Sequence, residues 1–119
     1  MRMDEIQVQA TTGRGGVRIL KLQGSLTLNS TFDFQSAARR ETTGAIIVDL
    51  SGVPYMDSAG LGAILGVLAS CERTRRRFAI AGAPERLQTL FRVARVDTLL
   101  PAFASVEEAE TRLSAGAGA

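Results

Sequence analysis

The chain has 119 residues, 45% of them hydrophobic and 22% charged, which is the size and composition of one folded domain that needs no metal or disulfide to hold it together. One cysteine and no histidine exclude an intrachain disulfide and a Ser-His-Asp triad, and they leave a zinc site without its usual ligands. The net charge is only +2, and we expect neither an enzyme nor a metal or cofactor site.

The chain opens with two segments of the kind that form half-buried strands. Apolar and polar residues alternate over residues 6–10, and a second such run begins at residues 17–19 and ends at Gly24. The glycine-rich segment 12–16 between them is typical of a hairpin turn. We therefore expect an opening β-hairpin.

A short helix and a buried strand follow the hairpin. Residues 29–31 offer helix N-caps ahead of an apolar periodic segment that ends near Gly44. Residues 45–50 are a nearly unbroken run of apolar, mostly β-branched side chains, which favours a central strand covered on both faces. Residues 51–54 break this strand.

A long apolar helix is predicted from Ser58 to about Glu72. Its face toward the sheet is expected to carry Leu61, Ile64, Leu65 and Leu68. Small apolar residues then remain on its other faces, namely Ala59, Ala63, Gly66 and Val67. Such a stripe indicates either a partner surface or close helix-to-sheet packing, and the pattern alone favours neither. Glycines at 60, 62 and 66 each cost an exposed helix about 0.8–1 kcal/mol relative to alanine, which close approach of another backbone would offset.

The remaining segments continue the alternation of strand and helix. Residues 78–81 are predicted to form another buried strand, and a short strand is expected near residues 102–103. Pro84 opens a helix between them, one side of which is lined by Leu87, Leu90, Phe91 and Ala94. Residues 105–108 have capping-box spacing ahead of a last helix that ends at about Leu113.

The order of these elements predicts an α/β fold with a four- to five-stranded mixed sheet, mostly parallel after its hairpin, and with helices packed against it. We expect one domain over residues 1–113 and a flexible small-residue tail over 114–119. The longest apolar stretch, residues 59–69, is shorter than the ~20 residues that span a bilayer, and the first residues lack the apolar region of a signal peptide. We therefore expect a cytoplasmic protein with no membrane association.

The charge of the chain is most concentrated after the long helix, at Arg73, Arg75, Arg76 and Arg77. Cations at this position offset the helix dipole, and no aromatic residues lie between them to stack on bases. We expect a solvated loop there and no nucleic-acid partner. Cys71, inside the predicted helix, is expected to be an inert core thiol.

Ser58 is the residue whose position points to a function. It begins a helix directly after the central strand, where ligand and partner sites of open α/β sheets gather. Met56 stands where a G-x-S-x-G elbow needs glycine, and the chain has neither a P-loop nor a G-x-G-x-x-G turn. Asp49 and Asp57 have the chemistry to bind a hard cation, although carboxylates in a strand and a loop are more often structural caps. The structural alternative for Ser58 is a helix N-cap that accepts a hydrogen bond from the N–H of residue 60 or 61.

Two segments resemble the signature of STAS domains, and in particular of bacterial anti-sigma factor antagonists. They are Asp-Leu-Ser-Gly-Val at residues 49–53 and Met-Asp-Ser-Ala-Gly-Leu-Gly at residues 56–62. The resemblance covers nearly the whole chain, because the opening hairpin, Gly24 and residues 103–109 fall in register with the family. It implies the STAS fold.

The resemblance also implies a mechanism. In the family, the serine of the D-S-x-G-L-G motif, here Ser58, is phosphorylated by an anti-sigma factor that is itself a serine kinase. The unphosphorylated protein binds this kinase and releases the sigma factor, phosphorylation abolishes the binding, and a serine phosphatase reverses it. The implied partner surface is Met56, Asp57, Ser58, Ala59, Gly60, Leu61 and Gly62. The alternative is a constitutive STAS scaffold or transporter-associated subunit without such a switch.

One position departs from the family pattern. Arg95 stands where the family usually has a glycine at the end of the third helix. A left-handed residue after a helix is costly without glycine, so we expect this helix to end differently.

Overall fold

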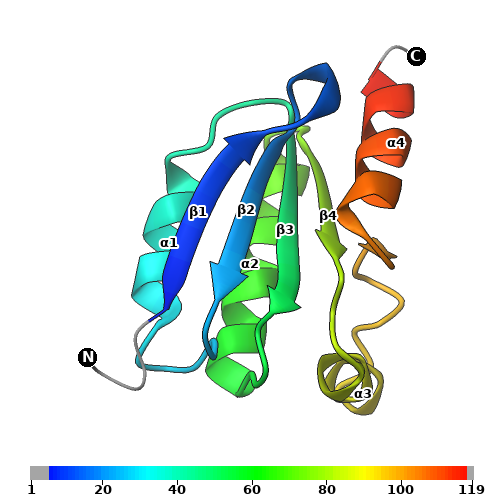
Figure 1. Cartoon of the computed structure of the whole chain (residues 1–119). Coiled ribbons are helices and arrows are strands. Elements are labelled where there is room, and N and C mark those ends of the chain that lie inside the picture. Colours follow the sequence, from blue (N-terminus) through cyan, green and yellow to red (C-terminus); the bar gives the residue numbers. More distant parts are fainter. Residues whose placement is uncertain (1–5, 118–119) are drawn as a thin grey trace.

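The computed structural model describes residues 6–117, and these form one five-stranded sheet with helices on both faces. The strands lie side by side in sequence order: β1 (Gln7–Thr12), β2 (Arg18–Gln23), β3 (Ala45–Gly52), β4 (Arg77–Ala81) and β5 (Ala102–Phe103). β1 pairs antiparallel with β2, and the other neighbours pair in parallel (Figure 1). This confirms the predicted mixed sheet with its opening hairpin, whose turn contains the 3-10 helix η1 (Arg14–Gly16).

The alternation of side chains along β3 divides the core into two layers. The helices are α1 (Thr31–Arg39), α2 (Ser58–Arg73), α3 (Glu85–Val93) and α4 (Val106–Ala117). Ile46, Val48 and Leu50 point into the larger layer, which residues of α1, α2 and α3 complete. Ile47 points into the smaller layer, where Ala109 and Leu113 of α4 cover it. β3 is thus buried on both faces, as its apolar run predicted.

All four parallel strands end at one edge of the sheet. Figure 1 shows this edge at the bottom, where α1, α2 and α3 begin, while η1 lies at the opposite end. The carboxyl ends of parallel strands are the usual place for binding sites in open α/β sheets. The fold therefore places the start of α2 where a partner or ligand has access.

The buried face of α2 differs from the predicted one. Ala63 and Val67 are buried, whereas Leu65 and Leu68 are only partly buried at the edge of the core. The reason is that α1 packs along this side of α2, which the spacing of apolar residues within α2 does not reveal. The exposed stripe of α2 is instead made of Ser58, Gly62, Gly66 and Ala69.

Two helices end at other residues than predicted. α1 ends at Arg39, well before Gly44, and Glu41 beyond its end forms an ion pair with Arg18 of β2 at 2.7 Å. α4 continues beyond Leu113 to Ala117, so the helix includes residues 114–117, which the sequence had assigned to the tail. The hairpin supports this extra turn, since Ser114 Oγ donates to the carbonyl of Arg14 at 3.0 Å. Residues 118–119 of the predicted tail lie outside the described residues.

The prediction that α3 ends differently from the family pattern is wrong. Arg95 adopts the left-handed conformation (φ 60) without being glycine, and Val96 N–H donates to the Phe91 carbonyl at 2.9 Å. α2 ends in the same way at Arg75 (φ 57). The hydrogen bond from Val96 N–H to the Phe91 carbonyl and the packing of Val96 on the core offset the strain of the left-handed Arg95.

Candidate functional site

The loop after β3 turns into α2 at Asp57, whose side chain caps the helix. Asp57 Oδ1 accepts a hydrogen bond from Gly60 N–H at 2.9 Å, and Oδ2 accepts one from Leu28 N–H at 3.1 Å. The backbone of Asp57 is extended, as is usual for an N-cap residue. One carboxylate therefore closes the first turn of α2 and ties it to the loop between β2 and α1.

Ser58 is the first residue of α2, and its side chain is exposed. Its hydroxyl forms no hydrogen bond with any of the described residues, because the capping position is taken by Asp57. The interpretation of Ser58 as the N-cap is therefore wrong by one residue. Capping of α2 therefore does not explain why residue 58 is a serine.

The two loops beside Ser58 are paired like a short piece of parallel sheet. Leu26 bridges to Met56, and Leu26 N–H donates to the Tyr55 carbonyl at 3.0 Å. Gly60 completes this contact, since a Cβ at its position would lie 2.1 Å from the Leu26 carbonyl oxygen. Close backbone approach therefore explains the glycine at 60. The start of α2 is held firmly in place.

The glycines at 62 and 66 have a different environment. A Cβ at either position would meet nothing within 4 Å, so neither glycine is required by packing within the domain. Both lie on the exposed stripe of α2 that begins at Ser58. Packing thus explains one of the three helical glycines, and the other two leave room for close approach from outside.

The structure separates the seven predicted contact residues into two groups. Ser58 and Gly62 are exposed, and Asp57 and Ala59 are half-buried. The others are buried, namely Met56, Gly60 and Leu61. These three hold the helix start against the sheet, and the other four are the ones accessible to a partner, so the contact surface stays a prediction.

Two exposed apolar side chains beside this surface were not predicted. Leu28 is 73% exposed and Tyr55 is 47% exposed, and both lie on the paired loops next to Asp57. The sequence pattern does not distinguish them from Leu26 and Met56, which lie in the same two loops and are buried. We define the switch surface, named after the switch that the sequence predicts at Ser58, as Leu28, Tyr55, Ser58, Ala59 and Gly62.

Asp57 gives the switch surface its charge. The pKa of Asp57 lies below its ordinary value, chiefly because Gly60 N–H stabilises the carboxylate, with a further contribution from Leu28 N–H. The carboxylate is therefore ionised at neutral pH. Both of its oxygens already accept hydrogen bonds from the backbone, so it is engaged as a cap and not as a base toward the Ser58 hydroxyl.

The other side chains considered in the sequence have structural roles. Asp49 Oδ1 accepts a hydrogen bond from Ser51 N–H at 3.0 Å, and within residues 6–117 no three potential ligand side chains gather in a way that would hold a metal ion. Arg76 donates to the Glu41 carbonyl at 2.6 Å, and Arg77 donates to the Leu113 carbonyl. These two arginines therefore do not form part of the expected solvated loop. Cys71 is buried, and its burial raises the pKa of the thiol.

Comparison with known proteins agrees with this architecture. The family described as STAS domain matches residues 9–109. An anti-sigma-B factor antagonist of Staphylococcus epidermidis is 36% identical over 62 residues, which are 52% of this chain and 57% of the relative. The chain thus matches little more than half the length of this curated relative. No helix of residues 6–117 has both the length and the apolar character that crossing a bilayer requires.

Solved structures show the same fold at low sequence identity. The unphosphorylated form of the anti-sigma factor antagonist SpoIIAA is 20% identical, with a TM-score of 0.72 over 89% of this chain and 95% of that one. The phosphorylated form of SpoIIAA, a Bacillus cell fate determinant, has a TM-score of 0.67 over 89% of this chain and 98% of that one. A sulfate transporter family protein from Wolinella succinogenes is 19% identical, with a TM-score of 0.77 over 92% of this chain and 93% of that one.

Proposed function

This chain belongs to the STAS domain family, and we propose that it is a cytoplasmic anti-sigma factor antagonist controlled by phosphorylation of Ser58. In its unphosphorylated form it binds an anti-sigma factor with serine kinase activity, and the sigma factor is released. Phosphorylation by that kinase ends the binding, and a serine phosphatase restores it. The protein acts as a regulatory binding partner and not as an enzyme.

The environment of the Ser58 hydroxyl is the observation that carries this proposal. The hydroxyl is exposed at the first position of a firmly held helix and bonds to none of the residues that the structure describes, with Asp57 serving as the cap. The chain has no histidine and supplies no free base next to Ser58. Such a hydroxyl is a substrate for another protein's chemistry, since the partner must contribute both the base and the phosphoryl donor.

The switch surface explains how a phosphate would end the binding. Leu28 and Tyr55 expose apolar side chains on the two loops beside the start of α2, and the Asp57 carboxylate next to Ser58 in the sequence is ionised. A phosphate adds about −1.5 to −2 charge next to this carboxylate. Burying that charge against an apolar partner is costly unless the partner supplies a cation, so the complex is weakened.

The names of related proteins and the phosphorylation state of a solved structure with the same fold support the proposal. The staphylococcal relatives are named anti-sigma-B factor antagonists, and SpoIIAA has been solved in unphosphorylated and phosphorylated forms. The likeness to a sulfate transporter family protein favours a second candidate, a transporter-associated or scaffold STAS subunit in which Ser58 is never modified. Phosphate on Ser58 separates the two candidates.

Phosphoryl transfer is the test of this proposal. The protein is incubated with ATP and candidate serine-kinase anti-sigma factors, and the modified residue is mapped by mass spectrometry. We expect one phosphate, on Ser58, and none on the Ser58→Ala variant. The matched control is Ser70→Ala, which alters a serine further along the same helix. Phosphate confined to other residues, or absent with every kinase tested, would support the unswitched candidate.

A further inference from the structure

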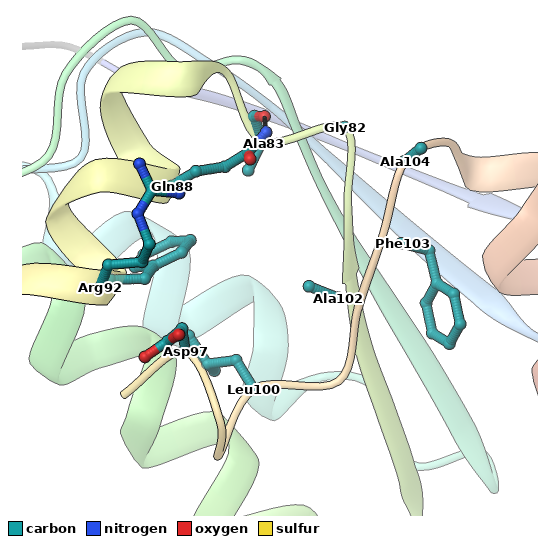
Figure 2. A pocket seen from close by; sticks show the side chains of 10 residues that line it. Gly82, Ala83, Gln88, Arg92, Asp97, Leu100, Ala102, Phe103 and Ala104 are labelled. Carbon is teal, nitrogen blue, oxygen red and sulfur yellow. Dashed lines mark hydrogen bonds between the residues drawn. The ribbon is translucent and has the colours of Figure 1, made fainter. Parts of the chain in front are cut away.

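A hollow opens beyond the ends of β4 and β5, and none of the switch-surface residues lines it. It has a volume of about 460 Å³, which is within the range of small-molecule sites. One wall comes from α3 with Gln88, Phe91 and Arg92, and the opposite wall from β5 with Ala102. Figure 2 shows Asp97 and Leu100 closing the hollow from below, and the side chain of Ala102 pointing into it.

The floor of the hollow is apolar. Phe91 and Leu100 line it, and they are only 4% and 5% exposed, so they are fixed by the core on their other sides. Alternation along β5 turns the Phe103 ring away from the space, as Figure 2 shows, and leaves the small Ala102 facing it. This arrangement leaves space above an apolar surface for a ligand side chain of moderate size.

The rim carries one cation and one anion that are not paired with each other. Arg92 Nη2 donates to Thr89 Oγ1 at 3.1 Å, and its other N–H groups have no acceptor side chain or carbonyl within the described part of the chain. Among the described residues, no ion pair or hydrogen bond involves the Asp97 carboxylate. Both side chains line the same hollow.

We propose that this hollow binds a free α-amino acid with an apolar side chain. The α-carboxylate is bound by the Arg92 guanidinium, which matches a carboxylate with two parallel N–H donors. The α-ammonium is bound by Asp97, and the apolar side chain lies on Phe91, Leu100 and Ala102. An anion would pair with Arg92 alone and a cation with Asp97 alone, whereas a zwitterion can pair with both, so the two charges together favour a zwitterion.

Titration of the whole chain with L-leucine, followed by backbone NMR, tests the binding. We expect saturable shift changes at Gly82, Ala102 and Ala104, which line the hollow, and none centred on Ser58. The matched probes are 3-methylbutylamine, which is leucine without its carboxylate, and 4-methylpentanoate, which is leucine without its amino group. Each lacks one ion pair and should bind at least about threefold more weakly.

Substitutions of Arg92 and Asp97 test whether these two side chains bind the charged groups of the amino acid. Arg92→Gln and Asp97→Asn should each weaken leucine binding at least about threefold, while Arg86→Gln, on the exposed side of the same helix, should leave it unchanged. Equal binding of leucine and 4-methylpentanoate would overturn the zwitterion assignment. The absence of saturable shifts at these residues would overturn the site itself. Neither result bears on Ser58, because the two surfaces are formed by different residues.

Discussion

Two adjacent residues at the start of α2 have different tasks. Asp57 caps the helix and binds the neighbouring loop, whereas the Ser58 hydroxyl has no hydrogen-bond partner among residues 6–117. A sequence with two capping residue types in a row does not reveal which of them caps the helix, because both serine and aspartate are favoured there. The hydrogen bond from Gly60 N–H to the Asp57 carboxylate shows that Asp57 is the cap. They also separate the residue that stabilises the site from the one that we propose is modified.

Removing the Asp57 carboxylate should destabilise the domain more than removing the Ser58 hydroxyl. We expect Asp57→Ala to lower the free energy of unfolding by ~1 kcal/mol, the usual cost of losing a cap, and Ser58→Ala to change it by less than ~0.5 kcal/mol. Urea denaturation of both variants measures this. A larger loss in Ser58→Ala than in Asp57→Ala would show that the cap is assigned to the wrong residue.

The same carboxylate should give the domain a specific dependence on pH. Because the pKa of Asp57 is lowered by folding, its contribution to stability is complete above the ordinary carboxyl value of about 4 and is lost as the pH falls through the folded-state pKa. Wild type should therefore lose more stability on acidification than Asp57→Asn, which retains a capping side chain that does not titrate. Parallel curves of unfolding free energy against pH for the two proteins would contradict this.

At the scale of the element, α2 carries three glycines with unlike roles. Gly60 lies against the Leu26 carbonyl, while Gly62 and Gly66 face open space. The sequence shows only that each glycine lowers helix propensity. Which of them is required depends on how closely a loop some thirty residues earlier in the chain approaches the helix. The spacing of residues within the helix does not show how close that loop comes.

Alanine substitution should distinguish these glycines sharply. Gly60→Ala places a Cβ 2.1 Å from a backbone oxygen, and we expect it to cost more than about 3 kcal/mol or to prevent folding. Gly62→Ala and Gly66→Ala are matched controls in the same helix and should stabilise the domain by up to ~1 kcal/mol each. Thermal unfolding of the three variants gives the comparison. Similar Tm values for all three would mean that the close approach at Gly60 is wrong.

The helix ends also carry a testable strain. Arg95 and Arg75 are left-handed where glycine would be unstrained, and such a conformation costs a non-glycine residue roughly 1–2 kcal/mol. Arg95→Gly should therefore stabilise the domain by ~0.5–1 kcal/mol after the loss of chain entropy is included. Arg86→Gly, inside α3, should destabilise it by a similar amount. A decrease in stability for Arg95→Gly would contradict the left-handed end of α3.

At the scale of the molecule, the sequence was most informative where a pattern is local. The buried run at residues 45–50 and the glycine-rich turn at 12–16 predicted β3 and the hairpin, and the alternation of elements predicted the fold class. The pattern failed where another element decides the outcome, as when α1 buries Ala63 and Val67. Local pattern also predicted only part of the candidate site. Ser58 was predicted from its motif, but Leu28 is brought next to Asp57 only through pairing of loops that are far apart in the sequence.

Phosphorylation should leave the molecule otherwise unchanged. Ser58 lies outside the core at a helix N-terminus, where an anion is tolerated or mildly favourable. We expect nearly the same Tm for the two forms, and backbone NMR shift changes confined to residues 26–28 and 52–66. Shift changes that extend to the first hairpin or to α4 would show that the switch acts through a change of conformation and not at the surface.

The affinity of the two forms for the kinase that modifies Ser58 tests the central claim most directly. Calorimetry should show that the unphosphorylated protein and Ser58→Ala bind with similar strength. The phosphorylated protein and Ser58→Asp should bind at least about tenfold more weakly, or ~1.4 kcal/mol, because charge is added beside Asp57. Equal affinities for the phosphorylated and unphosphorylated forms would contradict the switch.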